Sequence, residues 1–555
     1  MYALTNIDFS KPLGLVVSEL LPELEFARQN TTLARSAASA GAATMTSRIL
    51  GVVREQVLAA FFGAGNAMDA YNVAYRIPNL VRDLFAEGAM SSAFVPTFTR
   101  HLTNQGKASA WRLGNLVING LIVITAGLVI LGIVFAEPLV TLFASAYREV
   151  PGKLELTVFL TRLMLPFLTF VALAAAFMGM LNSLHRFFIP ALSPAMYNVA
   201  TITCALVLVP LMPGLGLPAI TAIAIGSLLG GAAQLAVQWP ALRREGFRYQ
   251  PVLDWRDESL RRVLVLMGPG TIGLAATQVN VFVNTVLATG EGTGAVSWLN
   301  YAFRLMYLPI GLFGVSIATA TLPAVSRHAA QSDEPAARRT VADGLTLMLV
   351  LNVPATVGLM VLATPIVRVI FERAAFTAAD TAATAAAVQF YALGLVGYSI
   401  VRIASPVFYA LGQNRTPVMI SVATVLANAL LNVALVRVMG YRGLALGTSI
   451  AALFNAALLM FFLRRRLDGI EGGRVAGSLV RIILASAVMG AAAVGADIAA
   501  GAWLPGTGLV VQIIRLAATI AIAIGVLSVA AYLLRIREFH DGMALVTRRF
   551  RMTSR

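Results

Sequence analysis

The sequence predicts an all-α protein that crosses a membrane many times. Its 555 residues are 58% hydrophobic and only 12% charged, and their mean hydropathy is +0.80. A soluble chain of this length needs far more polar surface. Long apolar stretches recur along the chain, and the loops between them are short and rich in arginine. This pattern is typical of polytopic membrane proteins.

The apolar stretches define the expected helices. A membrane-spanning helix needs about 20 apolar residues. About fourteen stretches meet this requirement: 37–63, 67–99, 112–136, 155–184, 190–211, 217–241, 260–289, 294–326, 339–363, 381–411, 416–437, 442–463, 476–500 and 507–534.

The distribution of basic residues predicts the orientation. Most loop arginines and lysines fall in alternate loops, and such residues are enriched on the cytoplasmic side of membranes. With an even number of spans, both termini are then expected in the cytoplasm. Residues 1–36 are mixed in charge and lack the apolar core of a signal peptide, which predicts a cytoplasmic tail. The loops that carry the positive charge are 100–112, 185–189, 242–262, 327–339 and 464–474, together with the C-terminal end.

Short segments recur at an offset of about 227 residues. AYNVAYRIP at 70–78 is similar to WLNYAFRLM at 298–306, and VPTFTRH at 95–101 is similar to LPAVSRH at 322–328. The copies begin at the first and seventh spans, so they share one topology, as in transporters built from parallel repeats. The expected organisation is an N-terminal tail, two six-helix lobes, a final helix pair and a basic cytoplasmic tail, at 1–36, 37–241, 242–463, 464–536 and 537–555.

Several classes of function are not supported by the sequence. The net charge is +16, but the basic residues lie mostly in short loops, so nucleic acid is not an expected partner. One cysteine and four scattered histidines give no metal-binding spacing. Phosphate-binding lysine loops, nucleophile elbows and dinucleotide fingerprints are absent from the sequence, and no loop is long enough for a catalytic domain. A transporter is therefore expected rather than an enzyme, without metal or organic cofactor.

Charged residues lie inside several expected spans. A charge at bilayer depth costs at least about 2.5–3.5 kcal/mol, so such a residue faces a partner or a water-filled cavity. These residues are Arg48, Arg54 and Glu55 in the first span, Asp69, Arg76, Arg82, Asp83 and Glu87 in the second, Arg304 in the eighth and Arg402 in the tenth.

The spacing of these charges leaves two interpretations open. Asp69, Arg76 and Asp83 are seven residues apart and share one stripe, which suits structural ion pairs, with Arg76 as the main candidate. Glu55 points away from its neighbour Arg54 on a helix. The other arginines outnumber the nearby carboxylates. Arginine binds phosphate oxygens through two parallel hydrogen bonds and keeps its charge, so an anionic substrate is favoured. The candidate substrate-binding residues are Arg48, Arg54, Arg82 and Arg304.

Five segments resemble a known family. TSRILGVVRE (46–55), FGAGNAMDAY (62–71), IPNLVRDLFAEGAMSSAFVP (77–96), LNSLHRFFIPALSP (181–194) and VSWLNYAFRLMYLPIGLFGVSIATATLP (296–323) are similar to the MurJ (MviN-type) lipid II flippases. These belong to the multidrug/oligosaccharidyl-lipid/polysaccharide exporter superfamily. The resemblance runs from about residue 37 to the C-terminus, and the second-span segment is its most specific part.

The resemblance implies a function in peptidoglycan biosynthesis. Such proteins move lipid II, an undecaprenyl diphosphate that carries the disaccharide-pentapeptide, from the cytoplasmic to the periplasmic leaflet of the bacterial inner membrane. It implies that a cationic cavity receives the diphosphate at the four candidate arginines. It also implies supporting or gating roles for acids such as Asp69 and Glu87, and a lipid-tail groove in the last two spans. Membrane lipids and cell-wall synthesis proteins are the further expected partners, for a monomer driven by membrane potential or an ion gradient.

The chain departs from the family at two places. Some members carry acids beside the eighth-span arginine, where this chain has Phe303 and Tyr307. Some carry a second arginine where this chain has Asp83. The first departure removes the carboxylates that ion coupling in the second lobe would use. The roles of Glu55, Arg76 and Arg402, in a cavity or in the scaffold, stay open.

Four alternative functions compete with this one. A flippase for another polyprenyl-diphosphate-linked oligosaccharide, such as an O-antigen precursor, needs a similar cationic cavity. A drug exporter would show an acid-rich cavity, and a membrane enzyme acting on polyprenyl diphosphate would need acids free to bind a metal ion. A scaffold for cell-wall enzymes would not need buried arginines at all.

Overall fold

The computed structural model describes residues 39–83, 90, 93–331 and 333–540, and this part of the chain is helical without strands. It forms two compact units, each assembled from separate chain segments. The first contains the described residues up to Arg54, Pro78–Val134 and Arg162–Thr271. The second contains Glu55–Ile77, Phe135–Thr161 and the chain from Ile272 onwards. The expected lobe boundaries stay a prediction.

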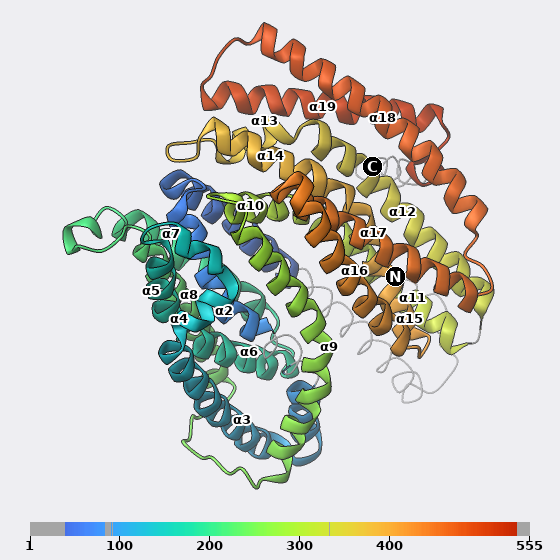
Figure 1. Ribbon diagram of the computed structural model, residues 1–555. Coiled ribbons are helices and arrows are strands. Elements are labelled where there is room, and N and C mark those ends of the chain that lie inside the picture. Colours follow the sequence, from blue (N-terminus) through green and yellow to red (C-terminus); the bar gives the residue numbers. More distant parts are fainter. Residues whose placement is uncertain (1–38, 84–89, 91–92, 332, 541–555) are drawn as a thin grey trace, which may run out of the picture. The chain divides into compact units, whose positions relative to one another are not determined.

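Helices α3, α6, α7 and α8 make up most of the first unit (Figure 1). Its helix α3 contains Gly106 at φ 81°, where two helical segments meet at a kink, because glycine adopts a positive φ without strain. Phe94, Phe98, Phe177 and Phe247 form the aromatic centre of the core. The helices are α3 (Val95–Val134), α6 (Phe167–Ser183), α7 (Phe188–Leu208) and α8 (Thr221–Arg244), followed by the start of α9 (Glu258–Thr289).

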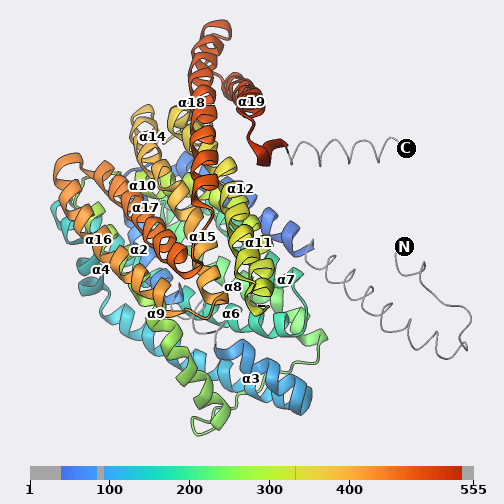
Figure 2. The same cartoon turned by 90° about the vertical axis from the view of Figure 1, so that its right-hand side faces the viewer.

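The second unit contains most of the remaining helices, and α18 packs on both α12 and α19 (Figures 1 and 2). From the first half of the chain it takes most of α2 (Asn66–Asp83), α4 (Ala136–Ala144), the 3-10 turn η3 (Ser145–Glu149) and most of α5 (Lys153–Met164). The later helices are α10 (Ala295–Pro309), α11 (Val315–Ala330), α12 (Glu334–Val361), α13 (Ala363–Phe371), α14 (Ala378–Leu393), α15 (Leu395–Ala410), α16 (Arg415–Met439), α17 (Tyr441–Arg466), α18 (Gly472–Trp503) and α19 (Leu509–Leu533).

Helix irregularities occur where glycine and proline gather. A π-helical turn, η5 (Ile310–Gly314), joins α10 to α11 directly after Pro309. Proline cannot donate a backbone hydrogen bond, and π turns are frequent at functional sites.

The loop 247–257 is held against α3 by hydrogen bonds. The side-chain amides of Asn115 and Asn119, on α3, donate to backbone carbonyl oxygens of this loop.

The helices are those of a protein that crosses a membrane many times. Among the described residues, nine helices are long and apolar enough to span, or ten when the bent pair α14 and α15 counts as one. The expected first, second, seventh and eighth spans are not among them. In the first described helix, 39–62, Arg48, Arg54 and Glu55 lower the hydropathy. Fourteen spans therefore stay a prediction, although the all-helical membrane fold is confirmed.

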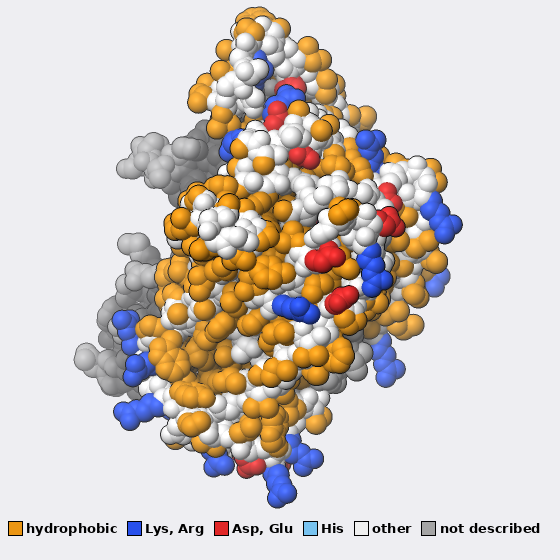
Figure 3. Space-filling view, turned by 60° about the vertical axis from the view of Figure 1, so that its left-hand side comes forward, with side chains coloured by type: hydrophobic (Ala, Val, Ile, Leu, Met, Phe, Trp, Pro, Cys, Tyr) orange, Lys and Arg blue, Asp and Glu red, His pale blue; other side chains and the backbone are white. Residues whose placement is uncertain are grey.

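The surface has the composition expected against lipid. Hydrophobic side chains cover most of the face in Figure 3. Large apolar side chains such as Ile130, Leu430, Val438 and Ile498 are more than half exposed. In water such a surface would cause aggregation. In a bilayer it is the ordinary outer face of a helix bundle.

Candidate functional site

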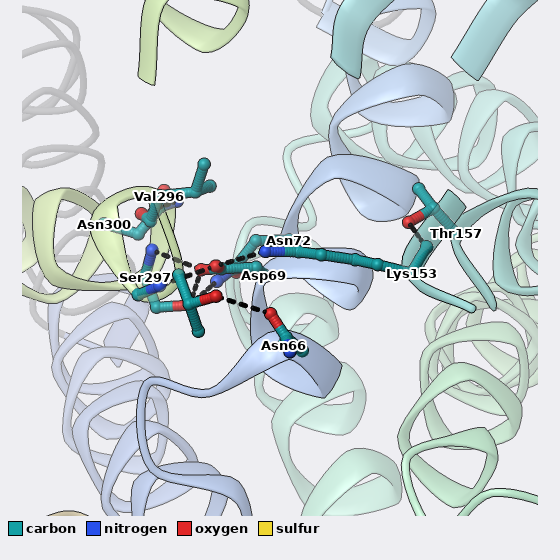
Figure 4. Close-up of polar contacts among 10 residues, drawn as sticks. Asn66, Asp69, Asn72, Lys153, Thr157, Val296, Ser297 and Asn300 are labelled. Atoms are coloured by element: carbon teal, nitrogen blue, oxygen red, sulfur yellow. Dashed lines mark hydrogen bonds and ion pairs between the residues drawn. The ribbon is translucent and has the colours of Figure 1, made fainter. Parts of the chain in front are cut away.

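A buried carboxylate in the second unit joins three helices (Figure 4). Asp69, in the first turn of α2, accepts an ion-paired hydrogen bond of 3.0 Å from Lys153 Nζ at the start of α5. It also accepts the backbone N–H groups of Gly294 and Ser297, at 2.8 and 3.1 Å, and the Ser297 hydroxyl at 2.7 Å. The backbone donors belong to the N-terminal end of α10. A carboxylate is stabilised there because the unpaired N–H groups and the helix dipole both favour negative charge.

Further polar contacts extend this network between α2 and α10. The Asn72 amide donates to the Ser297 hydroxyl at 3.1 Å, and Arg76 donates to the Asn300 side chain at 3.2 Å. Thr293 donates to Asn66 at 2.8 Å, just before α10 begins. Six hydrogen bonds join α2 to the start of α10, and three of them go to the fully buried carboxylate of Asp69, which makes this a specific junction.

The junction connects the two copies of the repeated segment. Asp69 and Ser297 each directly precede one copy, at 70–78 and 298–306. Asp69 pairs with Lys153 rather than with Arg76, so the alternative of ion pairs within α2 is wrong for Asp69. The hydroxyl of Ser297 lets the two equivalent positions meet, whereas two carboxylates there would repel each other.

Arg304 lies on α10 about two turns after Ser297. Its guanidinium forms an ion pair with Glu55, at the start of the second unit, and the Glu55 side chain is almost completely buried. Glu55 therefore contacts α10. The Arg304 side chain is 41% exposed.

The other three candidate arginines belong to the first unit. Arg48 is exposed on the helix 39–62, without an ion-pair partner among the described residues. Arg54 donates to the Asn198 side chain at 2.9 Å, and its guanidinium lies 5.1 Å from the centre of the Tyr197 ring. Both partners lie on α7, which the sequence did not predict as part of a site.

Arg82 and Asp83 form an ion pair at the end of α2, with the closest atoms 2.6 Å apart. Arg82 and Arg304 thus have acidic partners among the described residues. The expectation of an unpaired cationic cluster is wrong for these two, because neighbouring or cross-helix carboxylates reach them. Glu87 lies outside the described residues. Arg48, Arg54 and Arg82 belong to one unit and Arg304 to the other, so their convergence on one diphosphate stays a prediction.

Arg402, on α15, contacts the same helix as Arg304. It donates to the hydroxyl of Tyr307, and its guanidinium lies 5.9 Å from the centre of that ring. Sequence reasoning singled out Arg402 but missed the role of Tyr307 as its partner. Lys153 was also missed. In the sequence, Lys153 lies in a predicted loop beside an apolar stretch, and its partner Asp69 is 84 residues away.

Similarity to known proteins covers most of the chain. Residues 58–514 match the family described as lipid II flippase MurJ. A probable lipid II flippase MurJ of Vibrio cholerae is 34% identical over 436 residues, which are 77% of this chain and 82% of that protein. The lipid II flippase MurJ of Burkholderia cenocepacia is 35% identical over 427 residues, which are 76% of this chain and 82% of that protein.

Solved structures agree with the sequence comparison. A structure described as lipid II flippase MurJ in an inward closed conformation matches with a TM-score of 0.73 and 27% identity, over 89% of this chain and 99% of that one. An inward-facing multidrug transporter of the MATE family matches with a TM-score of 0.65 and 13% identity, over 79% of this chain and 99% of its own, which shows a shared fold. By sequence and by fold, the chain belongs to the lipid II flippase MurJ family.

Proposed function

We propose that this chain is a lipid II flippase, which moves the undecaprenyl-diphosphate-linked peptidoglycan precursor from the cytoplasmic to the periplasmic leaflet of the bacterial inner membrane. The observation that carries this proposal is its similarity to lipid II flippases over more than three quarters of its length. The chain is then a transporter and not an enzyme.

Binding of the diphosphate is assigned to Arg48, Arg54, Arg82 and Arg304. Charge-assisted hydrogen bonds from guanidinium groups to phosphate oxygens are strong and directional. Glu55 and Asp83 orient Arg304 and Arg82 through the ion pairs described above. A phosphate that approaches these arginines replaces part of each pairing, so substrate binding changes the contacts of Glu55 and Asp83.

The Asp69 junction serves as the outer gate in this proposal. With both termini in the cytoplasm, α2, α5 and α10 all begin on the periplasmic side. The bonds from Asp69 to Gly294 and Ser297 close this side while the substrate enters from the cytoplasm. Their rupture lets α10 separate from α2, as alternating access requires. The ion pair with Lys153 persists, because it does not involve α10.

Transport also requires a source of energy and a place for the lipid tail. A negative-inside potential acts on a cationic site with about 2.3 kcal/mol per charge per 100 mV, so membrane potential or an ion gradient can reset the empty carrier. The polyprenyl tail is assigned to the surface of α18 and α19, the helix pair of the second unit in which α18 packs on α12. We infer a monomer that contacts membrane lipids and cell-wall synthesis proteins.

Reconstitution tests the substrate assignment. The purified chain is placed in liposomes that contain fluorescent lipid II, and the fraction of label that a membrane-impermeant quencher reaches is followed over time. Parallel liposomes contain an O-antigen-type undecaprenyl-diphosphate oligosaccharide. Faster movement of lipid II than in protein-free liposomes supports the proposal. Movement of the O-antigen-type lipid alone would replace lipid II with the alternative substrate.

A further inference from the structure

An aromatic cluster lies beside Arg304 in the second unit. Phe303 contacts Tyr307 on α10, with ring centres 5.6 Å apart. It also meets Tyr391 on α14 and Tyr398 on α15 edge-on, at 5.5 and 6.5 Å. The diphosphate-binding scheme gives these rings no role.

The rings of this cluster differ in how far they are exposed, so some can support the cluster and another can contact a ligand. Tyr391 is only 7% exposed and packs behind Phe303, whereas Tyr307 is 38% exposed. Aromatic rings in a core bury both faces. Tyr307 instead keeps more than a third of its surface exposed, while Tyr391 and Tyr398 pack against its neighbour Phe303. The cluster is therefore a supported platform with one accessible ring.

Arg402 shows what this ring faces. Its side chain is exposed, it donates to the Tyr307 hydroxyl, and no carboxylate pairs with it among the described residues. Arg402 lies near the middle of α15, within the bent helix pair that is apolar enough to span. A permanent cation at that depth faces water or a ligand rather than lipid, because burial in hydrocarbon is too costly. Tyr307, bonded to Arg402, lines the same wetted face.

The position of Tyr307 relative to Arg304 suggests the ligand. The two residues are three positions apart on α10, so they share one face and are separated by roughly 4.5 Å along the helix axis. In the proposed function, Arg304 binds the diphosphate. The group joined directly to that diphosphate is the first sugar of the disaccharide, and it must lie within one sugar ring of Arg304.

The chemistry of the cluster suits a sugar ring. A pyranose presents C–H groups on its flat face, and these carry partial positive charge that the negative face of an aromatic ring attracts. Its hydroxyl and acetamido oxygens accept hydrogen bonds, and Arg402 has guanidinium donors beyond the one used by Tyr307. A second phosphate site would need more cations than this single arginine. A purely apolar lipid site would not contain Arg402.

We propose that Tyr307 and Arg402, supported by Phe303, form the subsite for the sugar ring attached to the diphosphate of the substrate. This inference rests on the proposed function. It makes the two residues determinants of headgroup recognition, while Arg304 binds the diphosphate of any polyprenyl diphosphate.

The test compares two ligands that differ only in the headgroup. Binding of lipid II and of undecaprenyl diphosphate, which has no sugar, is measured on the purified chain in nanodiscs. Tyr307→Ala and Arg402→Gln are each expected to weaken lipid II binding about tenfold, and to leave undecaprenyl diphosphate binding unchanged. Tyr307→Phe keeps the ring and is expected to retain most of the affinity. Arg304→Ala is expected to weaken both ligands.

A matched control uses Tyr409, another exposed tyrosine of α15. Tyr409→Ala should leave both affinities unchanged, and thermal unfolding of every variant shows that it is folded. Equal loss of both ligands in Tyr307→Ala, or loss of neither, overturns the sugar subsite while the flippase assignment stands. If the unaltered chain binds neither ligand, the proposed function fails and the subsite fails with it.

Discussion

The ammonium group of Lys153 lies 3.0 Å from the carboxylate of Asp69, and both side chains are almost completely excluded from solvent. Lys153 also lies 4.1 Å from the centre of the Tyr147 ring. Asp69 meanwhile accepts three hydrogen bonds from Gly294 and Ser297. A single carboxylate is thus shared between a partner on α5 and the N-terminal end of α10. Its contact with α10 can break without leaving the carboxylate uncompensated.

Removing the lysine should destabilise the protein more than removing both charges. Lys153→Met leaves Asp69 buried without its cation, which costs about 3 kcal/mol for a buried pair. Asp69→Asn combined with Lys153→Met removes the uncompensated charge and should recover a substantial part of this loss. Thermal or denaturant unfolding of the purified variants in detergent gives the coupling free energy through a double-mutant cycle. Simple additivity of the two single changes would contradict a direct interaction.

Locking the α2–α10 junction should stop transport. Asn66 and Thr293 bond to each other at 2.8 Å across it, so cysteines at these positions are expected to form a disulfide on mild oxidation. Cys204 is buried, and Cys204→Ala provides a background without other thiols. Flipping in liposomes should fall when the pair is oxidised and recover on reduction.

Each single cysteine variant, oxidised in the same way, is the control for that experiment. Asn66→Cys alone and Thr293→Cys alone should remain active. Undiminished flipping by the cross-linked double variant would show that this junction does not open during the transport cycle.

The sequence predicted the parts of this site that depend on local patterns, and it missed those that depend on packing between distant segments. Apolar runs and embedded charges were sufficient to predict helices, the membrane class and the candidates Asp69 and Arg304. The partner of Asp69 was not predictable, because Lys153 and Ser297 become neighbours only when α5 and α10 pack against α2. The neighbouring pair Arg82 and Asp83 was visible in the sequence.

Neutralising Glu55 should impair transport, although the arginines themselves keep their charges. Glu55→Gln keeps the shape of the side chain but removes the ion pair with Arg304. Arg304 then loses its fixed orientation, and a loss of about 1.4 kcal/mol in transition-state stabilisation slows flipping about tenfold. Initial flipping rates at equal protein density measure this effect. Glu149→Gln, an exposed acid of η3, is the matched control, and equal rates for both variants would contradict the orienting role of Glu55.

The ion-pair clasp at the end of α8 should make stability depend on pH in a defined direction. Glu245 accepts hydrogen bonds from Arg186 and Lys107, at 2.8 and 3.4 Å. The hydrogen bond from Arg186, followed by the charges of both cations, lowers the pKa of Glu245 below its ordinary value of 4.5. The unfolded chain therefore binds this proton more readily than the folded protein. The stabilisation is present above about pH 4.5 and is lost as the pH falls through the lowered value.

Glu245→Gln should therefore be less stable than the unaltered protein at pH 7, by about 1 kcal/mol or less because the cations are exposed. The difference should shrink as the pH falls below 4.5. Unfolding temperatures between pH 3.5 and 7 measure it. A difference that is independent of pH would show that Glu245 contributes through packing alone.

The most direct test of the flippase assignment measures lipid II exposure in cells. A bacterium whose own lipid II flippase can be switched off expresses this chain, and a periplasmic probe reports the exposed fraction of lipid II. Arg48→Ala and Arg82→Ala are tested beside it at matched membrane levels. We expect the unaltered chain to restore exposure and both well-expressed variants to fail to do so. A correctly inserted chain that restores no exposure would contradict the assignment of lipid II as its substrate.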